Sequence, residues 1–72
     1  MAYYDIWNLE TGNAVAEYDS EAEALELIRW TVETYGRNEA SSWALTEIDE
    51  SGEECVIAEG ETLMDRAFGV RT

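Results

Sequence analysis

The segment from Ser20 to Gly36, SEAEALELIRWTVETYG, decides the fold of this 72-residue chain because it contains signals for both ends of a helix. Ser20 and Glu23 have the spacing of a capping box, and acidic residues in the first turn suit the positive end of the helix dipole. Gly36 is of the residue type that most often follows the last helical turn. The segment therefore predicts a helix over residues 21–35.

One face of this helix is predicted to enter the core. When side chains are placed about 100° apart around the helix axis, one apolar arc contains Ala24, Leu25, Ile28, Val32 and Tyr35. Trp30 falls well outside that arc, with Leu27 and Thr34 beside it. Two interpretations stay open at this point. Either Trp30 lies along the helix surface, covered by neighbouring side chains, or these three residues form an apolar contact patch, since tryptophan is enriched among interface anchors.

Two short β-rich runs precede the helix. Residues 3–9 and 14–18 are separated by Glu10-Thr11-Gly12-Asn13, which has the composition of a turn. Gly12 and Asn13 tolerate a positive φ, so we expect the turn to be centred on residues 11–13. The pattern predicts a β-hairpin.

A second hairpin and a second helix are expected after the long helix. Residues 43–48 and 55–58 read as strands joined by an acidic tip, and Gly60 marks a break before an amphipathic helix over 61–68. The apolar face of that helix is Leu63, Met64, Ala67 and Phe68. The element order is β-β-α-β-β-α. We therefore expect one α+β domain over residues 1–72, with a single antiparallel sheet and two helices packed on one face.

Such a sheet leaves its other face open to water or to a partner. The first predicted strand has large apolar side chains on both of its faces. We orient Ile6 and Leu45 toward the helices, which leaves Tyr3, Trp7 and Leu9 on the open face. The surplus of aromatic residues over what a small core can hold is the main indication of an interaction surface.

The charge of the chain limits its partners. Four arginines, no lysine and no histidine stand against seventeen acidic residues, which gives a net charge of −13. This field repels nucleic acid and anionic lipid, so we expect neither direct nucleic-acid binding nor membrane binding. A GC-rich genome or a high-salt cytoplasm would also explain the acidity without any function. A single cysteine and the lack of a long apolar stretch predict a soluble, cytoplasmic protein.

Few kinds of catalytic chemistry are available to this composition. Without histidine and lysine, the usual nucleophilic triads, Schiff bases, histidine metal sites and phosphate-binding P-loops lack an essential residue. Cys55 lies in an apolar stretch, beside Glu53 and Glu54, and is expected to be a buried structural residue. The acidic tip lacks the ligand spacing of a calcium-binding EF-hand. We therefore predict no enzyme activity, no cofactor and no metal site.

Two non-enzymatic hypotheses remain. The first is a small acidic protein-interaction module or accessory subunit, which could also form a homodimer. Its contact residues would lie on the open sheet face or in the helix patch: Tyr3, Trp7, Leu27, Trp30 and Thr34. The second is an acidic inhibitor or nucleic-acid mimic that occupies a basic groove of its partner. Its acidic patch would lie on or beside the second hairpin: Glu47, Asp49, Glu50, Glu53 and Glu54.

The stretch from Asp19 to Leu25, which follows a predicted hairpin, resembles the strand-to-helix junction of HicB-type antitoxins. The Pro-Gly loop that such antitoxins carry before the helix is missing, as is a separate DNA-binding tail. The resemblance therefore assigns no family. It implies only that the inhibitor hypothesis includes an antitoxin-like form.

Overall fold

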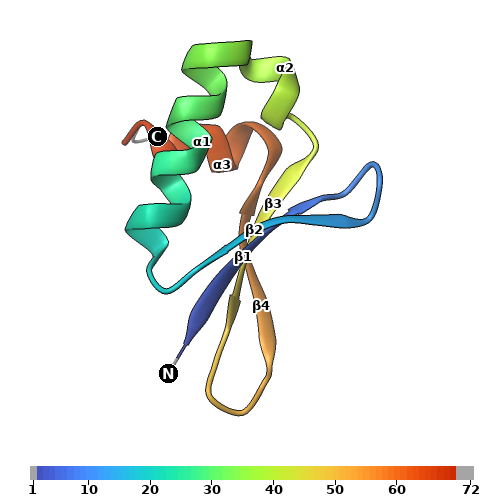
Figure 1. Ribbon diagram of the computed structural model, residues 1–72, viewed down its shortest axis with the longest axis vertical. Helices are drawn as coiled ribbons and strands as arrows, with labels where there is room; N and C mark the ends of the chain where they lie inside the picture. Colours follow the sequence, from blue (N-terminus) through green and yellow to red (C-terminus); the bar gives the residue numbers. More distant parts are fainter. Residues whose placement is uncertain (1, 70–72) are drawn as a thin grey trace.

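The computed structural model describes residues 2–69, which form a four-stranded sheet and three helices (Figure 1). The elements are β1 (Tyr3–Asn8), β2 (Asn13–Tyr18), α1 (Glu21–Tyr35), α2 (Arg37–Ala40), β3 (Trp43–Ile48), β4 (Glu54–Glu59) and α3 (Gly60–Ala67). The predicted α+β class and the β-β-α-β-β-α order of the main elements are confirmed. The predicted number of helices is wrong, because the four-residue helix α2 lies in the connection after α1.

All strand pairs of the sheet are antiparallel, and the strand order is β2-β1-β3-β4. The two hairpins therefore meet along β1 and β3. Their register places Ile6 opposite Leu45, and Leu45 opposite Ala58, in one row across three strands. Because side chains directly opposite in a sheet share a face, these three residues point to the same side.

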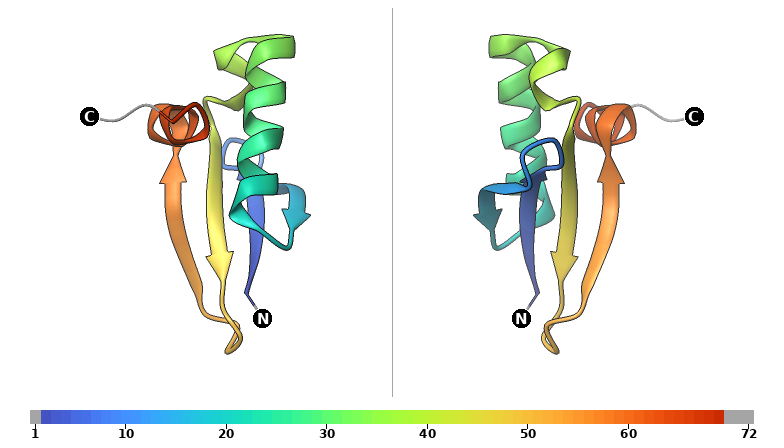
Figure 2. Two further views of the ribbon diagram at one scale, coloured as in Figure 1. Left: turned by 90° about the vertical axis from the view of Figure 1, so that its left-hand side faces the viewer. Right: turned by 90° about the vertical axis from the view of Figure 1, so that its right-hand side faces the viewer.

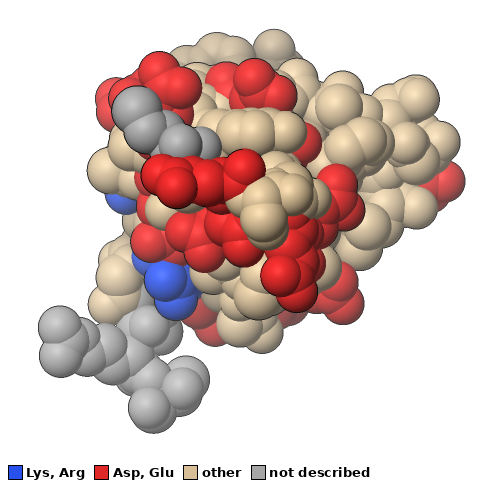
Figure 3. Space-filling view, turned by 90° about the horizontal axis from the view of Figure 1, so that it is seen from below, with Lys and Arg blue, Asp and Glu red and all other residues tan. Residues whose placement is uncertain are grey.

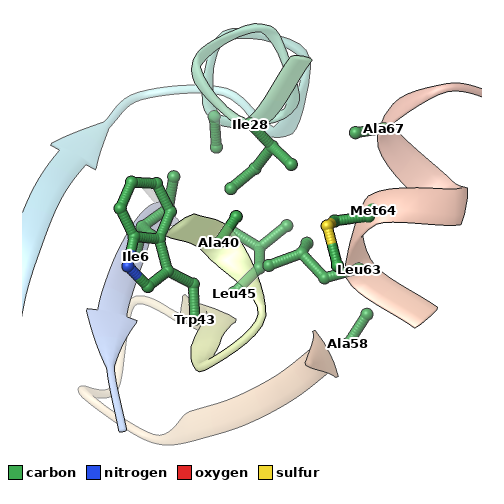
Figure 4. Close-up of a cluster of buried hydrophobic side chains, with 10 residues drawn as sticks. Ile6, Ile28, Ala40, Trp43, Leu45, Ala58, Leu63, Met64 and Ala67 are labelled. Atoms are coloured by element: carbon green, nitrogen blue, oxygen red, sulfur yellow. The ribbon is translucent and has the colours of Figure 1, made fainter. Parts of the chain in front are cut away.

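The core is built on that row (Figure 4). Ile6 and Leu45 are fully buried and Ala58 is nearly so. They belong to one cluster with side chains from all three helices and from the start of β3: Ala24, Ile28, Ala40, Trp43, Leu63, Met64 and Ala67. The orientation predicted for Ile6 and Leu45 agrees with this cluster. Figure 2 shows α1 beside β1 and β2, and α3 at the end of β4.

The predicted helix bounds of α1 match the structure, and its caps explain why. Ser20 is extended at the N-cap, and its Oγ accepts a hydrogen bond of 3.2 Å from the backbone N–H of Glu23. The Ser20 hydroxyl also donates to the Glu23 carboxylate, whereas a capping box forms its return bond at the backbone N–H of Ser20. At the other end Gly36, with φ +95°, donates to the carbonyl of Val32 at 2.8 Å.

The predicted burial is wrong for one residue of the core arc. Tyr35 is 65% exposed, although it points in the same direction as Ala24 and Ile28. It belongs to the last turn of α1, which rises above the sheet, so nothing of the sheet lies beneath it (Figure 1). Thr31 is buried in the arc instead, and its hydroxyl is satisfied by the carbonyl of Leu27 at 2.8 Å.

The first hairpin also differs slightly from its prediction. β1 ends at Asn8, and a turn over residues 9–12 leads into β2. The Asn8 side chain accepts from the backbone N–H groups of Glu10 and Thr11, and Gly12 takes the positive φ of +76°. The prediction that Leu9 lies on the open sheet face is wrong, because the Asn8 turn removes it from the strand and leaves it 56% exposed in the loop.

The second hairpin extends well beyond the helices (Figures 1 and 2). The prediction that Cys55 is buried is wrong, because Cys55 lies in this overhanging part and is exposed. Cys55 pairs with Glu47 on the same side as Leu45, but it lies on the edge strand and past the area that α3 covers. Phe68, expected on the apolar face of α3, caps that helix and is 40% exposed.

The Ser20 cap gives a test of how much the long helix depends on its first turn. Ser20→Ala should lower the free energy of unfolding by about 1 kcal/mol, because the backbone N–H of Glu23 loses its acceptor. Glu23→Gln should cost much less, since glutamine can also occupy this position of a capping box. Urea unfolding followed by circular dichroism measures both. Equal losses in the two variants would contradict the role assigned to the Ser20 oxygen.

Candidate protein-interaction surfaces

One face of the sheet is not packed against the helices. Because side chains alternate along a strand, Tyr3, Asp5 and Trp7 of β1 point to the other face from Ile6, away from the core cluster. The register places Ile48, Thr46 and Ala44 of β3 beside them in the same order. The two central strands therefore supply the middle of this uncovered face, and the outer strands β2 and β4 supply its edges.

The centre of this uncovered face is apolar and closely packed. Ile48 is 3% exposed and Ala44 is 2% exposed, although both point away from the helices. They are shielded by the side chains of neighbouring strands, among which Tyr3 and Trp7 lie directly opposite them. Val56 is 58% exposed beside them. The predicted contact residues Tyr3 and Trp7 thus lie next to buried apolar side chains, and Asp5 lies between them on the strand.

Carboxylates surround and interrupt this apolar centre. Glu17 of β2 and Glu54 and Glu59 of β4 are exposed on the two outer strands, and their pairing partners place them on the uncovered face. Asp5 lies in the middle, directly opposite Glu17. Like charges at directly opposite positions of a sheet destabilise it. The uncovered face therefore presents an apolar centre within an acidic border.

Asp5 is the least satisfied group on this face. Its Oδ1 atom is buried and has no hydrogen-bond partner within the described residues, and it stands between Glu17 on β2 and the buried Thr46 on β3. A buried acceptor without a donor costs stability, on the order of 1–3 kcal/mol. A cation placed over this face would stabilise the Asp5 carboxylate and offset its repulsion from Glu17.

The arginines do not supply that cation. Arg29 donates to the carbonyl of Ala67 at 2.8 Å, Arg37 contacts Glu61 and Asp65, and Arg66 contacts Glu21 at 2.6 Å. Each of these four contacts connects α3 with α1 or α2, on the helix side of the sheet. The fourth arginine, at position 71, lies outside the described residues. The three described arginines thus connect α3 to the other helices.

A second candidate surface lies on the helix side of the sheet. It is a shallow groove of about 310 Å³ between α1 and the end of β2, and its lining residues are Tyr18, Glu23, Glu26, Leu27 and Trp30. Trp30 is 53% exposed, and its ring meets the ring of Tyr35 edge to face, with 5.7 Å between centroids. The groove contains two of the three predicted patch residues; the third, Thr34, is exposed but does not line it.

The predicted contact residues therefore divide between two surfaces. Tyr3 and Trp7 lie on the uncovered face, while Leu27 and Trp30 lie on the side that carries the helices. Strand alternation was enough to place the first pair. Sequence reasoning did not predict the groove, because Tyr18 joins it only when β2 packs beneath α1. The spacing of positions 23, 26, 27 and 30 was a usable signal, since these residues share one face of the helix.

The acidic residues predicted on the second hairpin divide between the two faces of the sheet and the connecting turn. Figure 3 shows acidic side chains gathered at this end of the molecule. Glu47 faces the helix side and accepts a hydrogen bond of 2.9 Å from the Tyr4 hydroxyl, which raises the pKa of Tyr4. Glu54 points to the uncovered face, and Asp49 turns into the loop, with Glu50 and Glu53 exposed beside it.

Asp49 organises the hairpin turn. Its Oδ1 accepts from the Ser51 hydroxyl at 2.6 Å and from the backbone N–H groups of Ser51 and Glu53 at 2.9 and 3.0 Å. These donors stabilise the carboxylate, so the pKa of Asp49 is lower than its ordinary value. Asp49 is therefore a structural residue of the turn.

No grouping that could hold a metal ion occurs among the described cysteine, aspartate and glutamate residues. No described helix has the length and apolarity needed to cross a bilayer. Comparisons with protein-family models, with curated proteins and with solved structures give no match to this chain.

The hairpin turn should respond to acid in a defined direction. A carboxylate with a lowered pKa in the folded state stabilises the fold above its unfolded value of 3.8, and this contribution is lost as the pH falls through the lower folded value. We expect the backbone amide signals of Ser51 and Glu53 to titrate below pH 3.8. Asp49→Asn should abolish that titration. Amide signals that titrate with a midpoint at or above 3.8 would contradict the assignment.

Replacing Asp5 should stabilise the isolated protein. Asp5→Thr removes both the unsatisfied oxygen and the repulsion from Glu17, and we expect a gain of about 1 kcal/mol in the free energy of unfolding. Glu17→Thr should gain less, and the double variant should gain less than the sum because the repulsion is removed only once. Urea unfolding measures all three. A loss of stability in Asp5→Thr would show that the carboxylate supports the fold.

Proposed function

We propose that this protein is a non-catalytic interaction module that binds a basic protein through the uncovered face of its sheet. The observation that carries the proposal is the arrangement of that face, in which an apolar centre containing Tyr3 and Trp7 is bordered and interrupted by carboxylates. A stable interface commonly has an apolar core and a polar rim. Here the rim is acidic, so the complementary partner is basic.

The unsatisfied state of Asp5 supports a cationic contact in the middle of this face. Groups that reduce the stability of an isolated protein are often those that serve its binding. An arginine or lysine of the partner, surrounded by apolar side chains, would fit both the half-buried Asp5 carboxylate and its neighbours. The single described thiol, Cys55, is exposed and suits a reducing compartment, so we place the module in the cytoplasm.

A homodimer through this face is the less favoured form of the proposal. The face is self-complementary in its apolar centre, but its border residues Glu17, Glu54 and Glu59 would meet like charges from the second copy. The net charge of −13 adds a repulsion between whole molecules. Sedimentation equilibrium distinguishes the forms, because a monomer has a mass of 8.1 kDa.

The second candidate function is an acidic inhibitor or nucleic-acid mimic, and the acidic end of the second hairpin favours it (Figure 3). In that case the carboxylates themselves would occupy a basic groove, and apolar contacts would contribute little. Both functions require a basic partner. They differ in whether binding depends on the sheet face or on the hairpin tip.

The test is capture of the host partner by the immobilised protein, followed by affinity measurements on the purified pair. Trp7→Thr and Val56→Thr keep strand-forming residues while removing apolar contact area, and Trp7→Thr should weaken binding about 30-fold, as expected of an interface anchor. Leu9→Thr is the matched control, since Leu9 is an exposed apolar residue outside the face. An equal loss in Leu9→Thr would overturn the proposal.

The same pair separates the two candidate functions. For the sheet face, the double variant Glu50→Gln with Glu53→Gln should change affinity by less than about 3-fold, while a mimic should lose far more. Salt gives a second readout, because binding by charge alone falls steeply between about 50 and 300 mM salt, whereas an apolar centre is less sensitive. Strong dependence on the hairpin tip, with no effect of Trp7→Thr, would favour the inhibitor.

A further inference from the structure

We propose that the groove between α1 and β2 is a separate site that holds one arginine side chain of a protein or peptide ligand. The groove and the uncovered sheet face lie on opposite sides of the sheet, so this inference goes beyond the proposed function and does not depend on it. The occupant is identified by the chemistry of the five lining residues.

The walls of the groove suit the stem and the head of an arginine. Leu27 is partly buried against the core and, with the ring of Tyr18, provides an apolar floor for methylene groups. The Trp30 ring is half exposed, and its edge-to-face contact with Tyr35 restricts its orientation. Tryptophan is the most favourable aromatic side chain for contact with a cation, and a planar guanidinium can stack on it.

The charges of the groove select a cation. Two of its five lining residues are glutamates, and arginine, lysine and histidine are absent from the lining. Glu23 is already engaged by the Ser20 hydroxyl in the helix cap, so Glu26 is the carboxylate assigned to the ligand. Arg29, the nearest arginine in sequence, is directed to the Ala67 carbonyl on α3 and does not fill the groove.

Other occupants fit less well. A second copy of the chain would have to offer one of its few arginines against a net charge of −13 on each molecule. A purely apolar side chain would cover Trp30 but would bury the Glu26 carboxylate without a partner, which is costly. Arginine satisfies the ring and the carboxylate together, because its guanidinium both stacks and donates hydrogen bonds.

The test uses N-acetyl-arginine amide as the probe and the indole N–H signal of Trp30 as the readout. The signal is assigned with Trp30→Phe in ¹H–¹⁵N spectra of the full chain. We expect a saturable shift with a Kd of about 1–10 mM, in keeping with one cation–π contact and one carboxylate. N-acetyl-citrulline amide, which has the same shape without the charge, should give no saturable shift.

Matched charge variants locate the contact. Glu26→Gln should weaken the probe about 3-fold, whereas Glu53→Gln, an equal change of charge at an exposed position before β4, should weaken it by less than about 1.5-fold. Spectral dispersion reports whether each variant is folded. Equal effects of the two variants, an equal response to the citrulline probe, or no Trp30 shift up to about 100 mM probe would each overturn the site. None of these results bears on the sheet-face proposal.

Discussion

The burial of one cross-strand row, Ile6, Leu45 and Ala58, is the constraint on which the rest of the structure depends. These side chains come from three strands and point to one side, so both longer helices must lie on that side to cover them. A chain this short has room for only one such core. The packing of the helices on this row, and the face of the sheet left uncovered behind it, follow from burying that single row.

The distribution of charge follows from the same constraint. α3 is only eight residues long and buries Leu63, Met64 and Ala67, and the three described arginines add polar contacts that hold it to α1 and α2. The cations therefore gather in the helix layer. The carboxylates of the sheet are left to solvent or to a partner. This separation, rather than the net charge itself, gives the molecule an acidic surface with an apolar centre.

Much of the fold could be predicted because its signals are local. Ser20 and Gly36 fix the ends of α1 through their own backbone conformations, and strand alternation places Ile6 and Trp7 on opposite faces. The wrong predictions concern side chains whose exposure depends on whether another element of the fold covers them. Tyr35 has the right angular position but lies past the end of the sheet, and Cys55 has the right face but lies past the area that α3 covers.

The order of the main elements, the ends of the long helix and the opposite faces of Ile6 and Trp7 follow from local sequence, since each depends on residues close together in the chain. The pairing of Asp5, with its unsatisfied Oδ1, opposite Glu17 and the meeting of Tyr18 with Glu26 and Trp30 around one groove arise from tertiary packing. Both surfaces require the register between strands and the position of α1 over β2. Those are set by long-range packing, which local sequence patterns do not encode.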